Sequence, residues 1–176
     1  MNIFIVGPMG VGKSTISRHI AELLTKTFLD SDNEIEKRSG AKIPLIFEYE
    51  GESGFRQREQ AVINDLTANH NIVLSTGGGV VLNAENRKHL QTRGYVIYLH
   101  ASVDELLKRT AHSYNRPLLQ TANRREKLEK LVLERHPLYQ SVADVSIDTG
   151  HRSIRQVVKV VHKHLKEIIN NENIKS

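Results

Sequence analysis

The chain contains, within its first fifteen residues, a glycine-rich loop of the spacing G-x-x-x-x-G-K-S that runs from Gly7 to Ser14. An apolar stretch at 3–6 precedes it and a helix-patterned segment follows it, which is the setting that a phosphate-binding loop requires. Glycines let backbone N–H groups curl around phosphate oxygens, and the positive end of the following helix points at the same anion. Lys13 adds a charge for the outer phosphates, and Ser14 offers a hydroxyl to Mg²⁺. The motif therefore predicts a nucleotide-binding fold rather than a chance glycine turn.

Apolar runs alternate with amphipathic segments along the rest of the chain. The pattern predicts strands at 2–6, 27–29, 71–76, 95–99 and 142–147, and helices at 13–25, from 31, at 43–47, 55–66, 102–110, 124–134 and 154–168. Two capping boxes, at 31–34 and 102–105, mark helix starts. Strands that alternate with helices pair in parallel through crossover connections. We therefore expect an α/β fold of three layers, with a five-stranded parallel sheet flanked by helices.

Length and composition limit the possible functions. A chain of 176 residues forms one domain, and the absence of cysteine rules out disulfides and thiolate metal sites. The net charge of +5 fits either a nucleic-acid surface or a site for anions. The basic residues are scattered, with neither a Lys/Arg block nor an aromatic platform, so we favour small anionic substrates. No apolar run is long enough for a membrane span. We expect a cytoplasmic monomer that binds neither nucleic acid nor membranes.

Two acids and three glycines follow predicted strands. Asp30 and Asp32 come after the second strand, and Gly77-Gly78-Gly79 come after the third. Carboxyl ends of parallel strands meet at one edge of a sheet, so these segments should lie beside the phosphate loop. One carboxylate then suits Mg²⁺ and the other a substrate hydroxyl, although Asp32 also fits a first-turn acid favoured by the helix dipole. Three successive glycines favour close approach of the main chain to a ligand over a plain turn.

Three arginines are candidates for anion recognition. Arg56 has the planar fork that suits a carboxylate, but taken alone it reads as a surface charge. Arg116 lies in a polar, unpatterned stretch that reads as a flap able to close over ATP. Arg135 is predicted at the end of a helix. An equally good reading of Arg135 is a cation that stabilises the helix through its dipole and takes no part in anion recognition.

Together these residues resemble the shikimate kinases over most of the chain, from Gly7 to about Arg155. The segments that carry the resemblance are 7–15, Asp30-Ser31-Asp32, Gly54-Phe55-Arg56 with Glu59, Thr76-Gly77-Gly78-Gly79, Arg116-Pro117-Leu118-Leu119, and Glu134-Arg135 with Pro137-Leu138-Tyr139. Each occurs in other small-molecule kinases, whereas the ordered set is specific. The resemblance implies a nucleoside-monophosphate-kinase-like fold with sheet order 2-3-1-4-5 in one P-loop kinase domain, residues 1–176. It also implies a lid at about 112–124 and a substrate-binding helical segment at about 31–60.

The implied activity is ATP-dependent phosphorylation of the shikimate 3-hydroxyl, on the chorismate route to aromatic amino acids. By position, the resemblance implies catalytic roles for Lys13, Asp32 and Arg116. It implies that ATP is bound by Gly10, Val11, Gly12, Lys13, Ser14, Thr15, Arg109, Arg116 and Arg152, with Arg109 and Arg152 near the adenine. It implies that shikimate is held by Asp32, Arg56, Gly78, Gly79 and Arg135, the two arginines taking its carboxylate. Mg²⁺ would contact Ser14 directly and Asp30 through water.

Three other functions remain as alternatives. A gluconate or nucleotide kinase would share the phosphate loop, and Arg56 with Arg135 does not by itself exclude a nucleotide acceptor. A catalytically silent nucleotide-binding regulator is disfavoured, because the residues that silencing usually removes, such as Lys13 and Asp32, are intact. The third is a nucleic-acid-binding protein, for which a gel shift at physiological salt is the test.

Overall fold

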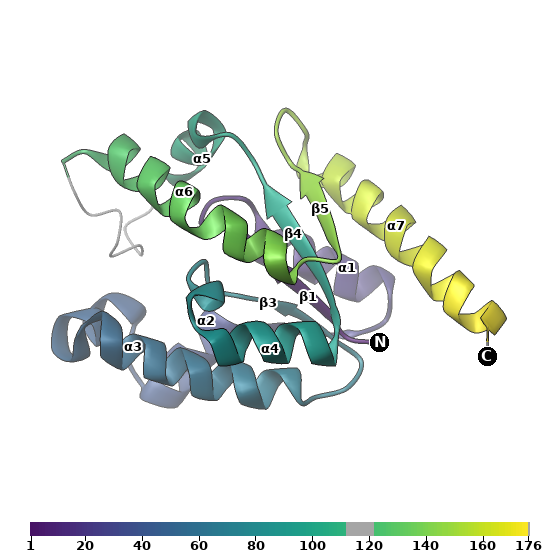
Figure 1. Ribbon diagram of the computed structural model, residues 1–176, viewed down its shortest axis with the longest axis horizontal. Helices are drawn as coiled ribbons and strands as arrows, with labels where there is room; N and C mark the ends of the chain where they lie inside the picture. Colours follow the sequence, from purple (N-terminus) through teal and green to yellow (C-terminus); the bar gives the residue numbers. More distant parts are fainter. Residues whose placement is uncertain (112–121, 176) are drawn as a thin grey trace.

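The computed structural model describes residues 1–111 and 122–175, without the side chains of 172–175. Its centre is a parallel sheet of five strands in the order β2-β3-β1-β4-β5 (Figure 1). The strands are β1 (Ile3–Val6), β2 (Thr27–Asp30), β3 (Ile72–Ser75), β4 (Tyr95–His100) and β5 (Val145–Asp148). The α/β class, the parallel pairing and the strand order expected from the sequence are all confirmed.

Helices cover both faces of this sheet (Figure 1). They are α1 (Lys13–Leu23), α2 (Ser31–Ser39), α3 (Ile43–Thr67), α4 (Ala84–Arg93), α5 (Val103–Thr110), α6 (Arg124–Val142) and α7 (Ile154–Lys175), with a short 3₁₀ turn, η1 (Val80–Leu82). Among the helices of the described residues, none combines the length and the apolar character that crossing a lipid bilayer takes.

The central strand divides the core into two halves. Ile3 and Ile5 face one side, where they pack with apolar residues of α1, α5 and α7, whereas Phe4 and Val6 face the other, with residues of α3 and α4. All four side chains are fully buried. Because side chains alternate along a strand, a four-residue apolar run supplies both cores at once. The middle of the sheet is therefore a rigid base for the loops at its carboxyl edge.

The structure departs from the predicted elements at α4 and η1, which the sequence reading missed. Leu90 is the only apolar side chain of α4 that is fully buried, so the segment shows no apolar period of 3.6 residues. Its helix start is nevertheless encoded, because Asn83 Oδ1 accepts hydrogen bonds from the N–H groups of Glu85 and Asn86.

Helix α6 is longer than predicted and runs through Pro137 to Val142 instead of ending near Glu134. Proline removes one helical hydrogen bond, and the carbonyl that loses it belongs to Leu133, on the exposed side of the helix. The turn beyond Pro137 buries Tyr139 and Val142 in the core, and this packing keeps the helix intact. The sequence also predicts a break near Gly51 and Gly54 between the two halves of α3. The structure has that break at Gly51, which has a φ of +69°, whereas Gly54 lies within the helix.

Candidate active site

The phosphate loop lies between β1 and α1, as predicted. Gly10 and Gly12 have φ angles of +82° and +100°, which favour glycine, and a Cβ on Gly10 would approach Thr110 Cγ2 to 2.6 Å. The residue at the N-cap of α1 is Gly12, which has no side chain to cap the helix, so the start of α1 opens directly onto the loop. Val11 is fully buried, and its N–H donates to the Pro8 carbonyl at 3.4 Å. The loop thus presents backbone donors and a helix N-terminus to one anion.

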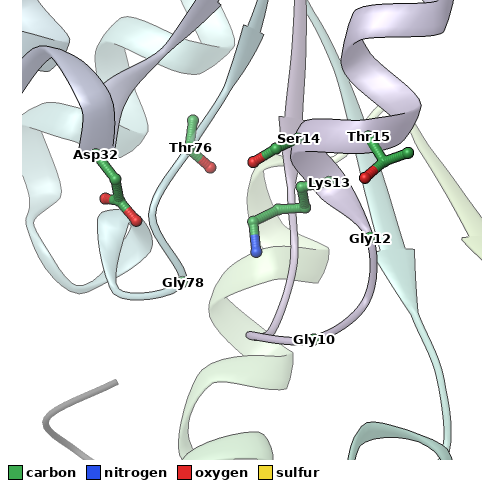
Figure 2. A pocket seen from close by; sticks show the side chains of 8 residues that line it. All are labelled: Gly10, Gly12, Lys13, Ser14, Thr15, Asp32, Thr76 and Gly78. Atoms are coloured by element: carbon green, nitrogen blue, oxygen red, sulfur yellow. The ribbon is translucent and has the colours of Figure 1, made fainter. Parts of the chain in front are cut away.

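Lys13 points from the start of α1 into a cavity of about 220 Å³ (Figure 2). Its Nζ donates to the carbonyls of Gly7 and Pro8 at 2.8 and 2.9 Å, which folds the side chain back along the loop. The other lining residues are Gly10, Gly12, Ser14, Thr15, Asp32, Thr76 and Gly78. The cavity therefore joins the phosphate loop to the ends of β2 and β3, which are far apart in the sequence.

Ser14, Asp30 and Ser75 bring three oxygen-bearing side chains together. Ser14 Oγ donates to Asp30 Oδ2 at 2.7 Å and lies 3.2 Å from Ser75 Oγ. Hydroxyl and carboxylate oxygens are the donors that Mg²⁺ prefers, and Mg²⁺ takes few protein ligands because it keeps several waters. No cluster of three or more acidic or histidine ligands occurs among the described residues. The donor set fits Mg²⁺.

Asp30 is also the N-cap of α2, which corrects the predicted capping box by one residue. Its Oδ1 accepts from the N–H groups of Asp32 and Asn33, whereas Ser31 was expected to be the cap. The buried Ser31 hydroxyl instead accepts from the Gly77 N–H at 3.0 Å, which ties the end of β2 to the glycine triplet. Asp30 and Ser31 both have side chains suited to capping a helix. The hydrogen bond from the distant Gly77 to Ser31 decides between them, and Asp30 is left as the cap.

The glycine triplet lies between acidic and basic side chains. A Cβ on Gly77 would lie 2.7 Å from Asp32 Oδ1 and 2.9 Å from Glu59 Oε1, and one on Gly79 would overlap the Arg56 guanidinium. These glycines therefore let two carboxylates and one guanidinium reach the main chain. This contact is the physical reason for glycine at 77 and 79. The sequence predicts close approach of the main chain to a ligand, whereas the groups that approach it here are side chains of the protein.

Arg56 is held by two carboxylates of α3. It donates to Glu59 Oε2 at 2.8 Å and to Glu52 Oε1 at 3.1 Å. Glu59 is 1% exposed, and burial raises the pKa of its carboxyl, while the charges of Arg56 and then Arg135 oppose that rise. Glu59 Oε1 and Arg56 Nε are buried without a hydrogen-bond partner among the described residues. Arg56 is thus a positioned guanidinium, not the surface charge of the alternative reading.

Arg135 lies inside α6 and not at its end, so the alternative of a helix-terminal cation is wrong. Its side chain is 4% exposed, and its Nη1 would lie 3.7 Å from a Cβ on Gly78. The extension of α6 beyond Pro137 is what places Arg135 beside the glycine triplet. A second buried arginine therefore faces the same segment as Arg56.

The remaining predicted residues lie apart from this cluster. Arg109 donates to Thr149 Oγ1 at 3.0 Å, to its carbonyl at 3.1 Å and to the Val11 carbonyl at 3.4 Å, so it links the phosphate loop to the segment after β5. Arg152 is exposed and donates to the Asp148 carbonyl at 2.9 Å. Arg116 and residues 112–121 of the predicted lid lie outside the described residues.

The sequence indicated no functional role for three residues near the carboxyl edge of the sheet. Glu59 stands three residues after Arg56, the spacing at which helical side chains meet, and that was the available signal. Thr76 lines the cavity, although its hydroxyl donates to the Ile5 carbonyl at 3.0 Å. No local pattern marks Ser75, because its position next to Ser14 depends on the register of β3 against β1.

Comparisons with known proteins agree with this geometry. The family model described as "Shikimate kinase" matches residues 9–166. A shikimate kinase of Methylococcus capsulatus is 56% identical over 158 residues, which cover 90% of this chain and 88% of that protein. The structure of a shikimate kinase from Acinetobacter baumannii in complex with shikimate has a TM-score of 0.91 at 50% identity, covering 97% of this chain and 93% of that one. A gluconokinase from Sinorhizobium meliloti, at 16% identity and a TM-score of 0.62, shares the fold alone.

Proposed function

This chain belongs to the shikimate kinase family, and on that premise we propose how its residues transfer a phosphoryl group from ATP to the 3-hydroxyl of shikimate. The observation that carries the assignment of roles is the convergence of Arg56, Arg135 and Asp32 on one glycine triplet, opposite Lys13. An anionic alcohol placed there has its carboxylate on the arginines and a hydroxyl near the phosphate loop.

The arginines bind the acceptor carboxylate. Both guanidiniums are largely buried, and a charge-assisted hydrogen bond in such a setting is shorter and stronger than a neutral one. Glu59 and Glu52 hold the Arg56 fork in place before the acceptor arrives, so little side-chain entropy is lost on binding. The acceptor is therefore oriented by its anionic end, with Gly78 and Gly79 beneath it.

Asp32 and Lys13 act at the other end of the acceptor. Asp32 accepts the proton of the attacking hydroxyl, or orients that hydroxyl toward the γ-phosphate. Lys13 stabilises charge on the phosphate oxygens as the bond to the leaving ADP breaks, while the N–H groups at 10–15 hold the phosphates. Ser14 and Asp30 would hold Mg²⁺, which supplies charge neutralisation on the phosphates when bound. Arg116 is assigned as the cation that closes over the transferring group, and Arg109 and Arg152 as adenine neighbours.

The assignment is tested by measuring ADP release with shikimate, gluconate, AMP and water as acceptors. We expect turnover with shikimate at least about a hundredfold faster than with gluconate, because gluconate is an open chain that cannot place both its carboxylate and its hydroxyl as a ring does. Equal turnover with gluconate or AMP would contradict the proposed acceptor. Release with water alone at the same rate would contradict a kinase.

We further propose that the protein acts in the cytoplasm as a monomer, without a nucleic-acid or membrane partner. Scattered basic residues and a cysteine-free sequence support this proposal. Sedimentation at assay concentration, with and without ATP and shikimate, tests the monomer, and a ligand-dependent dimer would contradict it.

A further inference from the structure

Tyr139 is buried directly behind the glycine triplet, at a position that the proposed mechanism does not use. Its side chain is 1% exposed, and its hydroxyl donates to the carbonyl of Gly78. Burial raises the pKa of Tyr139, while the charge of Arg135, one turn earlier in α6, acts in the opposite direction. The phenol therefore stays protonated and remains a donor at any pH where the enzyme works.

The hydrogen bond from Tyr139 to the Gly78 carbonyl fixes the orientation of the whole peptide group, and not of the carbonyl alone. The described backbone has no cis peptide, so the Gly78–Gly79 peptide is trans, and its C=O and N–H point in opposite directions. Holding the Gly78 oxygen toward α6 thereby sets the direction of the Gly79 N–H as well. Glycines resist such rotation least of all residues, so this peptide needs an external contact to keep one orientation.

The ring of Tyr139 is held in turn by β4. It stacks on Tyr98 with centroids 5.0 Å apart and an interplanar angle of 24°, and Tyr98 Oη lies 2.8 Å from His136 Nδ1. Tyr98 comes from the rigid middle of the sheet, whereas His136 is the neighbour of Arg135 in α6. The two tyrosines therefore connect the central sheet to the turn of α6 that carries Arg135.

We propose that Tyr139 is a positioning residue for acceptor recognition: its hydroxyl orients the Gly78–Gly79 peptide, and its stacked ring fixes the α6 turn that presents Arg135. The inference rests on the proposed function, since it assigns the acceptor to this glycine segment. Tyr139 lies beside Pro8 and Met9 of the phosphate loop, but its hydroxyl donates to Gly78 and not to that loop. Loss of the hydroxyl should therefore weaken shikimate binding more than ATP binding.

The test is Tyr139→Phe, which keeps the ring and removes the hydroxyl. We expect the KM for shikimate to rise about three- to tenfold, as for the loss of one neutral hydrogen bond, while the KM for ATP stays within about twofold. Calorimetric titration with shikimate should show the same loss. The matched control is Tyr95→Phe, which removes a comparable hydroxyl contact, to His164 Nε2 at 2.9 Å, at the opposite end of β4. It should lower Tm similarly and leave both KM values unchanged.

Three results would overturn the inference. They are an unchanged shikimate KM in Tyr139→Phe, a parallel rise of both KM values, and a rise of the shikimate KM in the Tyr95→Phe control. Should Tyr139→Phe not fold, Tyr98→Leu takes its place, because it removes the ring on which Tyr139 stacks and leaves the Tyr139 hydroxyl in place. An unchanged shikimate KM in Tyr98→Leu would then overturn the inference. Failure of the proposed function looks different, since the unmutated enzyme would then not phosphorylate shikimate.

Discussion

Replacement of Asp30 should separate metal binding from helix capping, because its two carboxylate oxygens have different partners. Oδ2 accepts from Ser14 Oγ at 2.7 Å, whereas Oδ1 accepts from the N–H groups of Asp32 and Asn33 at 3.0 and 3.2 Å. Asparagine offers one oxygen to the same N–H groups and caps helices as well as aspartate does. Asp30→Asn should therefore keep the free energy of unfolding within about 0.5 kcal/mol, while it removes the charge beside Ser14.

The expected magnitudes differ for the two properties. Asp30→Ala loses the cap, which costs about 1 kcal/mol, and for a chain of this size that lowers Tm by roughly 2–4 °C. Groups that orient a metal ligand change metal affinity by about 10- to 100-fold when they are removed. Both variants should therefore need at least about tenfold more free Mg²⁺ for half-maximal rate, and only Asp30→Ala should lose stability.

The assay is the rate of ADP release against free Mg²⁺ at fixed ATP, together with Tm by calorimetry. Asn83→Ala is the matched control, because Asn83 caps α4 with the same geometry, at 2.8 and 3.1 Å from two N–H groups, away from the phosphate loop. It should lower Tm as Asp30→Ala does and leave the Mg²⁺ dependence unchanged. A normal Mg²⁺ dependence in Asp30→Asn would refute the metal assignment. A Tm loss in Asp30→Asn equal to that of Asp30→Ala would refute the capping argument.

Three further variants test the assigned roles by steady-state kinetics. Lys13→Ala should lower kcat about a hundredfold or more, since one electrostatic contact to the transition state contributes roughly 2.7–4 kcal/mol; near-normal turnover at saturating ATP would contradict it. Arg56→Lys keeps the charge but loses the fork that bridges Glu59 and Glu52, so the shikimate KM should rise about tenfold or more. A change in the ATP KM alone would show that the acceptor site is misplaced. Asp32→Asn should lower kcat about a hundredfold while ATP affinity by calorimetry stays within a few-fold; unchanged kcat and shikimate KM would leave Asp32 as a helix-start acid only.

Features that depend on consecutive residues were predicted from the sequence. The phosphate loop is one example, because eight adjacent residues supply its glycines, its lysine and its hydroxyl. The helix start at Ser102 is another, since its hydroxyl accepts from Glu105 N–H as the capping box predicts. The parallel sheet followed from the alternation of apolar runs, and its strand order from the family resemblance.

Features that depend on residues far apart in the sequence were missed or misplaced. Ser31 looked like a helix cap, but it accepts from Gly77, forty-six residues away, and Asp30 caps the helix instead. The start of α6 was predicted well, yet its end lies beyond Pro137, because burial of Tyr139 outweighs the hydrogen bond that proline removes. In these places local signals pointed to one structure and tertiary packing selected another.

The sequence by itself determined the glycine-rich loop at the end of the first strand and the helix that follows it, because loop conformation and helix start are encoded locally. Only the tertiary structure decided that Arg135 of α6 shares one buried site with Arg56 and Glu59 of α3, since the two helices are far apart in the sequence. Burial makes such a group costly unless a partner from elsewhere in the chain meets it, and that partner is invisible along the sequence. The proposed acceptor side of the site is therefore a property of packing, whereas the proposed phosphate side is a property of the motif.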